Sequence, residues 1–405
     1  MKLSALIARR YFLARSSSNA VNIITGISVL GILVGTTALI IVLSAFNGLE
    51  NLVKGFYEAF DPALKITATE GKYFSPKLVD SSEVLQNKAI ATHSYTLAEK
   101  ALFSYQDHEY IATLKGVDAQ FDAVTAIKAH LSSGRYRLED SLNLPPAVLG
   151  GGVAYRLGFG PAQYDDPLQV FVPGKLPQGL NLSGAYRQQN IYPTGIFAIQ
   201  PEFDEKYVLV PLGFAQQLYR RPQQISAVEL KLKPQAKPQA VKEALQAQLG
   251  QTLQVQTREE QQAVFFKVMK TEGLFTFLVF ALILAIATFT IAGSLSMLLF
   301  EKRANLQTLH ALGMSLVQLR RIFFYEGLII SGTGGFIGLA LGLLLVWLQQ
   351  QYGLIKVGSG YIVEAYPVAL QGQDVLQVAA TVFVLSLVAS YFTSRRLKQA
   401  HLHQA

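Results

Sequence analysis

Four long runs of apolar residues divide the chain. They are Ile23–Phe46, Leu274–Phe300, Phe323–Leu348 and Val375–Phe392. A helix needs roughly 20 residues to cross the hydrocarbon core of a bilayer, and each run meets or approaches that length. We therefore predict four transmembrane helices, over residues 21–46, 273–300, 322–348 and 375–394. A cleavable signal peptide has an apolar core of about 7–15 residues. The first run is longer, so we predict an uncleaved span.

Glycines recur at a spacing of four inside two of these runs. Gly31 and Gly35 share a face of the first predicted helix, and Gly334, Gly338 and Gly342 share a face of the third. Small residues at this spacing let the backbones of neighbouring membrane helices approach closely. We expect this spacing to serve packing within one chain, and a subunit interface is the alternative.

The region between the first two runs, residues 47–270, has short alternating segments instead of long apolar ones. Its pattern predicts a hairpin of Tyr95–Tyr105 with Tyr110–Val117, an amphipathic helix over Lys237–Leu249, and a strand, glycine turn and helix over Ala147–Phe159. Further short strands are expected at Ala63–Thr69, Leu168–Val172, Thr194–Ile199, Tyr207–Val210, Ile225–Leu232 and Leu253–Gln256. We predict an α+β domain with two halves, 63–130 and 225–258, that flank a strand-rich insert at 147–220.

One stretch of this region has no periodic pattern. Residues 174–190, GKLPQGLNLSGAYRQQN, are polar and rich in glycine and glutamine. Such composition is typical of an exposed loop, so we predict a protruding loop here.

The distribution of charge orients the predicted spans. Residues 50–272 carry 23 basic and 23 acidic residues, whereas the rest of the chain carries 12 basic and 4 acidic ones and so accounts for the whole net charge of +8. Basic residues concentrate on the cytoplasmic side of membrane proteins. We therefore expect residues 1–20, 301–321 and 395–405 in the cytoplasm. Residues 47–270 and 349–374 are expected on the other side, the periplasm of a Gram-negative cell.

Common catalytic and metal-binding patterns are absent. The sequence has no cysteine, no G-x-x-x-x-G-K-[ST] phosphate loop and no H-E-x-x-H motif. Its histidines lack metal-ligand spacing apart from His401 and His403, next to the end of the sequence given. We expect no catalytic residue, no metal site and no cofactor in this chain.

The segment between the second and third runs has a pattern of its own. Leu306, Leu309 and Leu312 recur at helical spacing, and Gly313 suits a helix C-terminus. Ser315 with Gln318 predicts a capping box that starts the next helix. The segment is thus expected to be a short helix between two spans. Such a helix would suit contact with a soluble partner protein. The alternative interpretation is an ordinary basic loop.

Several motifs resemble those of ABC transporter permeases of the MacB/FtsX type. Glu301-Lys302-Arg303 followed by Leu309-x-Ala311-Leu312-Gly313-Met314 resembles the coupling helix of these permeases, with His310 and Met314 in place of the usual arginine and alanine. Ile27–Glu50, including Asn47-Gly48-x-Glu50, is similar to the lipoprotein-releasing LolC/LolE subfamily. The remaining matches are Ala147–Phe159, Ala389-Ser390 and Arg395-Arg396.

The resemblance implies a set of partners and candidate contact residues. It implies a cytoplasmic ABC ATPase dimer that binds ATP and magnesium, a second permease subunit, a lipoprotein substrate, membrane lipid and a periplasmic carrier protein. The implied ATPase contacts are Glu301, Lys302, Arg303, Leu306, Leu309, Leu312, Gly313 and Met314. The implied carrier contacts are Lys175, Leu176, Pro177, Gln178, Leu180 and Tyr186. A lipid or lipoprotein pocket is expected around Leu43, Phe46, Leu274 and Phe277, which ordinary packing or lipid-facing positions would explain equally well.

Other functions remain compatible with the sequence. A MacB-type efflux permease, an FtsX-type regulator of cell-wall hydrolases and a membrane scaffold or sensor without transport are the alternatives. The coupling-helix pattern favours a transporter over a scaffold, because a scaffold needs no rigid cytoplasmic helix. The sequence does not distinguish a LolC-like from a LolE-like subunit or a homodimer.

Overall fold

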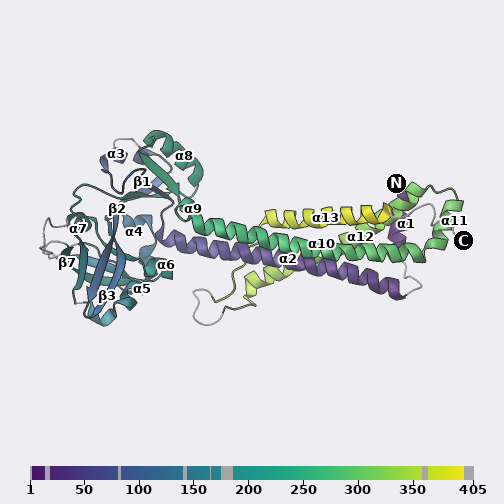
Figure 1. Cartoon of the computed structure of the whole chain (residues 1–405), viewed down its shortest axis with the longest axis horizontal. Coiled ribbons are helices and arrows are strands. Elements are labelled where there is room, and N and C mark those ends of the chain that lie inside the picture. The colour runs from purple at the N-terminus through teal and green to yellow at the C-terminus, as the bar shows by residue number, and fades with distance from the viewer. Residues whose placement is uncertain are drawn as a thin grey trace, which may run out of the picture. The chain divides into compact units, whose positions relative to one another are not determined.

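The computed structural model describes residues 2–13, 19–80, 84–139, 144–164, 166–174, 186–357 and 364–395. The chain divides into two compact units. The helical unit comprises Met1–Leu52 and Lys267–Ala405, and the sheet domain comprises Val53–Phe266. Helices and strands carry the labels of Figure 1.

The helical unit contains the four predicted spans. Among the described residues, four helices are long and apolar enough to cross a membrane, namely α2 (Asn19–Phe60), α10 (Ala263–Glu301), α12 (Leu316–Tyr352) and α13 (Gly372–Arg395). Two shorter helices accompany them, α1 (Lys2–Leu13) and α11 (Arg303–Ala311). The α2 helix continues to Phe60, well beyond the apolar run that ends at Phe46, and its last turns contribute side chains to the sheet domain. Hydropathy marks the apolar part of a helix and not its end.

The glycine faces pack against helices of the same chain. A Cβ atom at Gly334 of α12 would lie 2.7 Å from the Val29 carbonyl oxygen of α2. A Cβ atom at Gly338 would lie 2.5 Å from the Leu33 carbonyl oxygen of the same helix. The Thr37 hydroxyl of α2 donates a hydrogen bond of 2.9 Å to the Gly338 carbonyl. The α12 glycines therefore serve packing within one chain, as predicted from their spacing.

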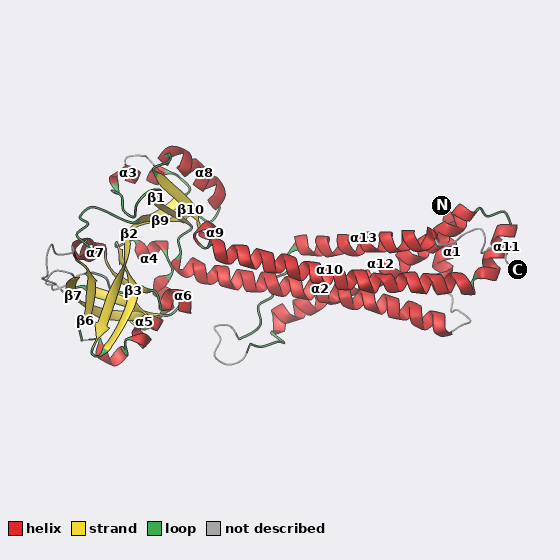
Figure 2. Ribbon diagram, viewed as in Figure 1, coloured by secondary structure: helices red, strands yellow, loops and turns green. Residues whose placement is uncertain are grey.

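The sheet domain is built on one ten-stranded sheet in the described residues, drawn yellow in Figure 2. The strand order is β10-β1-β9-β2-β3-β8-β5-β7-β4, and β6 pairs with β2 and β7. The strands are β1 (Leu64–Ala68), β2 (Ile90–Tyr105), β3 (His108–Val117), β4 (Leu131–Gly134), β5 (Pro146–Gly150), β6 (Leu168–Pro173), β7 (Tyr186–Phe197), β8 (Tyr207–Pro211), β9 (Ala227–Leu232) and β10 (Leu253–Thr257). The helices are α3 (Lys77–Asp80), α4 (Phe121–Val124), α5 (Gly151–Arg156), α6 (Pro201–Asp204), α7 (Leu212–Leu218), α8 (Pro238–Leu249) and α9 (Arg258–Gln261), with 3₁₀ turns η1 (Val84–Gln86), η2 (Ile127–His130) and η3 (Pro161–Gln163).

The long strand β2 links two hydrophobic cores. Its first part, with Ile90, joins the core that α8 covers over β1, β9 and β10. Its second part, from Leu97, joins β3, β5, β6 and β8 in the other core. The predicted hairpin is confirmed, but most of it belongs to the core of the region predicted as an insert. An alternating pattern reveals a strand without revealing which strands it pairs with.

The predicted loop at 174–190 does not extend to Asn190. Its last five residues, from Tyr186 to Asn190, are the start of β7 and pair with β6, with Tyr186 opposite Pro173 and Asn190 opposite Gln169. This stretch is polar on both faces, so it lacks the alternation that marks a strand. Residues 175–185 lie outside the described residues.

An aromatic cluster holds the end of α2 within the sheet domain. Tyr57 and Phe60 pack against Phe121, Phe197 and Phe203, all of which are buried. The ammonium group of Lys115 lies 4.5 Å from the ring centroid of Phe60 and forms a buried ion pair of 2.9 Å with Glu229. The aromatic rings and the carboxylate together compensate the burial of this cation.

Candidate functional site

The segment that connects α10 to α12 ends its short helix with a glycine. The helix α11 runs from Arg303 to Ala311, and Gly313 follows with a φ of 94°. The backbone N–H of Gly313 donates to the His310 carbonyl at 2.9 Å, and that of Met314 donates to the Leu309 carbonyl at 3.0 Å. These two bonds form a Schellman motif, which requires a left-handed residue and so favours glycine. The predicted helix end at Gly313 is confirmed.

A capping box begins α12. The Ser315 hydroxyl accepts a hydrogen bond from the Gln318 backbone N–H, and the Gln318 side chain accepts one from the Ser315 backbone N–H at 2.8 Å. The end of α11 and the start of α12 are therefore each fixed by their own hydrogen bonds, as the sequence predicts.

The three leucines of this segment do not share one environment. Leu306 is only 1% exposed and packs among Ala8 of α1 and Leu319 of α12. Leu309 is half-buried against the same cluster, whereas Leu312 is 78% exposed. The spacing argument fails at Leu312 because α11 ends at Ala311. We therefore correct the prediction for Leu306, whose side chain is occupied by its own chain.

The exposed residues of this segment form one surface. They are Ala304, Asn305, Thr308, Ala311, Leu312 and Gly313, and we call this set the α11 surface. The α11 surface is thus the exposed side of a short helix and the two residues after it, and Leu312 is its one large apolar side chain.

The charged residues before α11 face their own chain more than solvent. The side chains of Glu301 and Lys302 are 14% and 18% exposed, and their charged groups lie 3.4 Å apart. Arg303 is half-buried, and Met314 is buried in the cluster around Leu306. Glu301 and Lys302 are thus mostly covered and lie close to each other, and Met314 packs with Leu306, so their predicted contacts with an ATPase stay predictions.

The residues expected to form a lipid pocket lie in different environments. Leu43 and Phe277 are half-buried and pack against the core of the helical unit. Phe46 is also half-buried, whereas Leu274 is 57% exposed. Packing explains Leu43 and Phe277, and the exposure of Leu274 on a predicted span suits contact with lipid.

Most of the residues expected to contact a carrier lie outside the described residues. These are Lys175, Leu176, Pro177, Gln178 and Leu180. Tyr186 is described, and its exposed ring packs edge-on against Phe171, with 5.7 Å between the ring centroids. Tyr186, Phe171 and the exposed Ile111 line an apolar groove of about 780 Å³.

The structure assigns a role to Asn47 and Gly48 that spacing did not predict. The Asn47 side chain donates hydrogen bonds to the Asp374 carboxylate and, at 3.4 Å, to the Ala369 carbonyl. The Ala369 backbone N–H donates to the Ser44 carbonyl at 2.8 Å. A Cβ atom at Gly48 would lie 2.3 Å from the Pro367 carbonyl oxygen. We call this set the Asn47 contact; it fastens the segment between α12 and α13 to α2.

A buried glutamine orders the same segment. The Gln349 side chain donates to the carbonyls of Ile355 and Tyr366 at 3.0 and 3.1 Å and accepts a bond of 2.8 Å from the Ile355 backbone N–H. The sequence offered one signal for this arrangement, the Asn47-Gly48 pair directly after an apolar run. Its partner segment, 364–374, has no pattern of its own.

Comparisons with known proteins agree with this architecture. Residues 25–248 match the MacB-like periplasmic core domain, and residues 277–402 match the FtsX-like permease C-terminal region. The chain is 24% identical to the lipoprotein-releasing system transmembrane protein LolC of Neisseria meningitidis, with 100% of this chain and 98% of that protein covered. It is 26% identical to LolE of Haemophilus influenzae, with 98% and 97% covered.

Solved structures with a similar domain include the periplasmic region of MacB from Actinobacillus actinomycetemcomitans, which is 10% identical with a TM-score of 0.36 and covers 53% of this chain and 97% of its own. The extracellular domain of the transporter YknZ from Gram-positive bacteria is 10% identical with a TM-score of 0.34 and covers 48% and 99%. The core-domain match extends over more than half of the chain, and the C-terminal match covers the third and fourth predicted spans and the second from residue 277. The chain therefore belongs to the MacB/FtsX type of ABC transporter permease, with a MacB-like periplasmic core domain between its first and second membrane helices.

Proposed function

We propose that this chain is a permease subunit of a transporter that releases lipoproteins from the bacterial inner membrane. Full-length similarity to LolC and LolE supports the substrate class. The observation that carries the coupling part of the proposal is the α11 surface. A helix capped at its end by Gly313 and packed through Leu306 onto its own spans transmits a displacement instead of absorbing it.

A cytoplasmic ABC ATPase dimer is the partner of the α11 surface in this proposal. ATP and magnesium bind to that dimer, and this chain supplies no catalytic residue. A second permease subunit, homologous or identical, completes the membrane part. The helices α2 and α10 each contribute residues to both units. In this proposal they transmit movement of the helical unit to the periplasmic domain.

Lipoprotein extraction requires an external energy source. Each methylene of an acyl chain contributes roughly 0.8 kcal/mol to membrane attachment, so an anchor with several chains does not leave the bilayer spontaneously. ATP hydrolysis by a separate subunit supplies that free energy. The proposal is tested by ATP-dependent release of a lipid-anchored protein from proteoliposomes.

We propose the membrane orientation that the basic residues at the span ends favour, with both termini in the cytoplasm. We expect a cysteine introduced at Gln188 to react with a membrane-impermeant maleimide in intact spheroplasts. A cysteine at Thr308, also exposed, should react only after lysis. The sequence lacks cysteine, so either label reports a single site. Labelling of Thr308 and protection of Gln188 in intact cells would reverse the assigned orientation.

Residues 175–185, which precede β7 in the sequence and are predicted to be a loop, are the proposed contact for a periplasmic carrier. Their place in the domain resembles the carrier-contacting loop of LolC-type chains, and the apolar groove beside Tyr186 adds a surface that a protein partner would cover. Deletion of residues 175–185 should weaken carrier binding in a pull-down and leave ATPase association intact. Equal carrier binding by the intact and shortened proteins would rule the loop out.

A further inference from the structure

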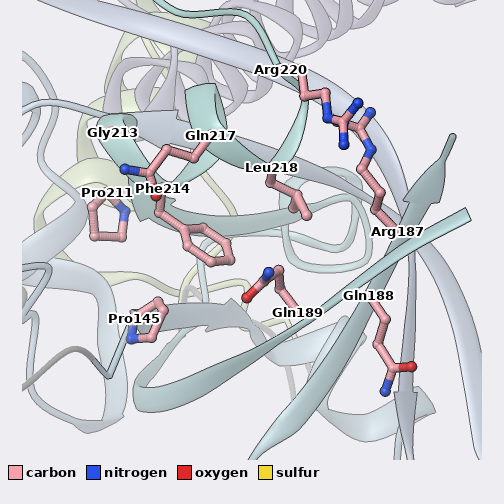
Figure 3. Close-up of a pocket in the computed structure, with 10 residues that line it drawn as sticks. All are labelled: Pro145, Arg187, Gln188, Gln189, Pro211, Gly213, Phe214, Gln217, Leu218 and Arg220. Carbon is pink, nitrogen blue, oxygen red and sulfur yellow. The ribbon is translucent and has the colours of Figure 1, made fainter. Parts of the chain in front are cut away.

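A second pocket of the sheet domain carries a concentration of positive charge. It has a volume of about 680 Å³ and lies between the start of β7 and the helix α7 (Figure 3). Its lining residues are Pro145, Arg187, Gln188, Gln189, Pro211, Gly213, Phe214, Gln217, Leu218 and Arg220. This set has two arginines, three glutamines and no carboxylate. The pocket therefore presents many hydrogen-bond donors without a built-in counter-charge.

Arg187 has donors that its own chain leaves unused. Its Nη2 group donates to the Pro173 carbonyl at 3.2 Å. Its Nε and Nη1 atoms are buried, and no hydrogen-bond partner exists for them in the part of the chain that the structure describes. Native proteins leave few buried donors unpaired, because an unpaired donor loses its water without compensation. The geometry thus suits a ligand that supplies acceptors.

Arg220 adds a second positive charge to the pocket that Arg187 lines. Figure 3 shows its guanidinium group next to that of Arg187. Burial and the Arg220 charge both lower the pKa of Arg187. Two cations in such proximity repel each other, and an anion between them would relieve the repulsion.

The backbone conformation of Arg220 also favours a functional role for this residue. Arg220 follows α7 with a φ of 52°, and the N–H groups of Arg220 and Arg221 donate to the carbonyls of Gln217 and Gln216 at 3.1 and 2.8 Å. This is a Schellman motif, whose left-handed position normally holds glycine. A strained non-glycine residue is often retained for a functional reason.

We propose that the pocket binds a phosphate group between Arg187 and Arg220. A phosphate ester or inorganic phosphate carries a charge of about −1.5 to −2 at neutral pH, which balances two guanidinium groups. Its oxygens can accept hydrogen bonds from both guanidinium groups, whose planar arrangement of N–H donors suits bidentate binding of phosphate. The amides of Gln189 and Gln217 supply further donors, and Phe214 with Pro145 forms an apolar wall for the group that carries the phosphate.

The test uses the full-length protein in detergent with an environment-sensitive fluorophore on a cysteine at Gln188, which lines the pocket. Titration with inorganic phosphate at constant ionic strength should give a saturable signal. Arg187→Gln and Arg220→Gln should each raise the half-saturating concentration about tenfold or more, because each removes charge-assisted hydrogen bonds. Arg220 is exposed, so its replacement leaves the fold intact.

Arg221→Gln is the matched control. The Arg221 guanidinium stacks 4.5 Å from the Tyr73 ring centroid and is not among the lining residues, so its loss should leave the titration unchanged. A parallel titration with dihexanoyl phosphatidic acid, kept below its micellar concentration, separates the two sources. Tighter binding than that of inorganic phosphate assigns a lipid headgroup, and equal binding assigns free phosphate. The absence of a saturable signal, an equal response to chloride, or an unchanged response in both pocket variants would overturn the proposal.

Discussion

Replacing Leu312 by aspartate is expected to release the ATPase from the purified complex while the permease stays folded. Leu312 is 78% exposed and lies directly after α11, so it makes few contacts with its own chain. Burying a leucine at an interface contributes about 1.5–3 kcal/mol, and a buried unpaired carboxylate adds a further penalty. We expect the affinity of the ATPase to fall at least about tenfold, measured by titrated co-purification.

Two controls separate this result from general damage. Leu354→Asp changes a leucine that is 63% exposed between α12 and α13, and it should leave ATPase binding unchanged. Leu306→Ala should instead lower the stability of the chain by about 2–5 kcal/mol, because Leu306 is buried in its own cluster. Normal ATPase affinity in Leu312→Asp would mean that α11 contacts the membrane surface and not the ATPase.

The second large effect is expected at Gly48. Gly48→Ala places a Cβ atom 2.3 Å from the Pro367 carbonyl oxygen and 2.5 Å from the Val368 Cα atom. Backbone atoms do not move aside as a flexible side chain does, so the Asn47 contact should open. Overpacking of this kind costs typically 1–3 kcal/mol, which exceeds the roughly 0.5–1 kcal/mol that alanine gains over glycine in a helix. The apparent melting temperature in detergent should therefore fall.

Gly26→Ala is the control for this substitution. Gly26 lies in the same helix, and a Cβ atom there would have nothing within 4 Å. Its melting temperature should stay equal or rise slightly, since only the helix propensity changes. A Gly48→Ala protein as stable as Gly26→Ala would show that the segment between α12 and α13 is not held tightly against α2.

Local signals along the chain predicted much of the architecture. Long apolar runs indicated the four membrane helices, and the Gly313 and Ser315–Gln318 signals placed the end of α11 and the start of α12. These features depend on residues close together in sequence, so a pattern is sufficient to find them. The hairpin of β2 with β3 was also predicted, because alternating apolar and polar residues and a short turn define it.

Features that depend on distant residues were not predictable from pattern. The burial of Leu306 depends on α1 and α12, which cover it from remote parts of the chain. Glu301 and Lys302 are predicted to contact a partner protein, yet their side chains are mostly covered. The polar start of β7 becomes a strand only through its pairing with β6. The pocket between Arg187 and Arg220 likewise joins two elements that nothing in the sequence connects.

The most direct test of the proposed function is release of a lipid-anchored protein from proteoliposomes. The vesicles would contain this chain, its partner permease and the ATPase, with a soluble carrier outside. The account predicts that the lipid-anchored protein moves to the soluble fraction with ATP, remains in the vesicles without ATP, and remains there with Leu312→Asp even when ATP is present. An assembled, ATP-hydrolysing complex that leaves the lipid-anchored protein in the vesicles would contradict it.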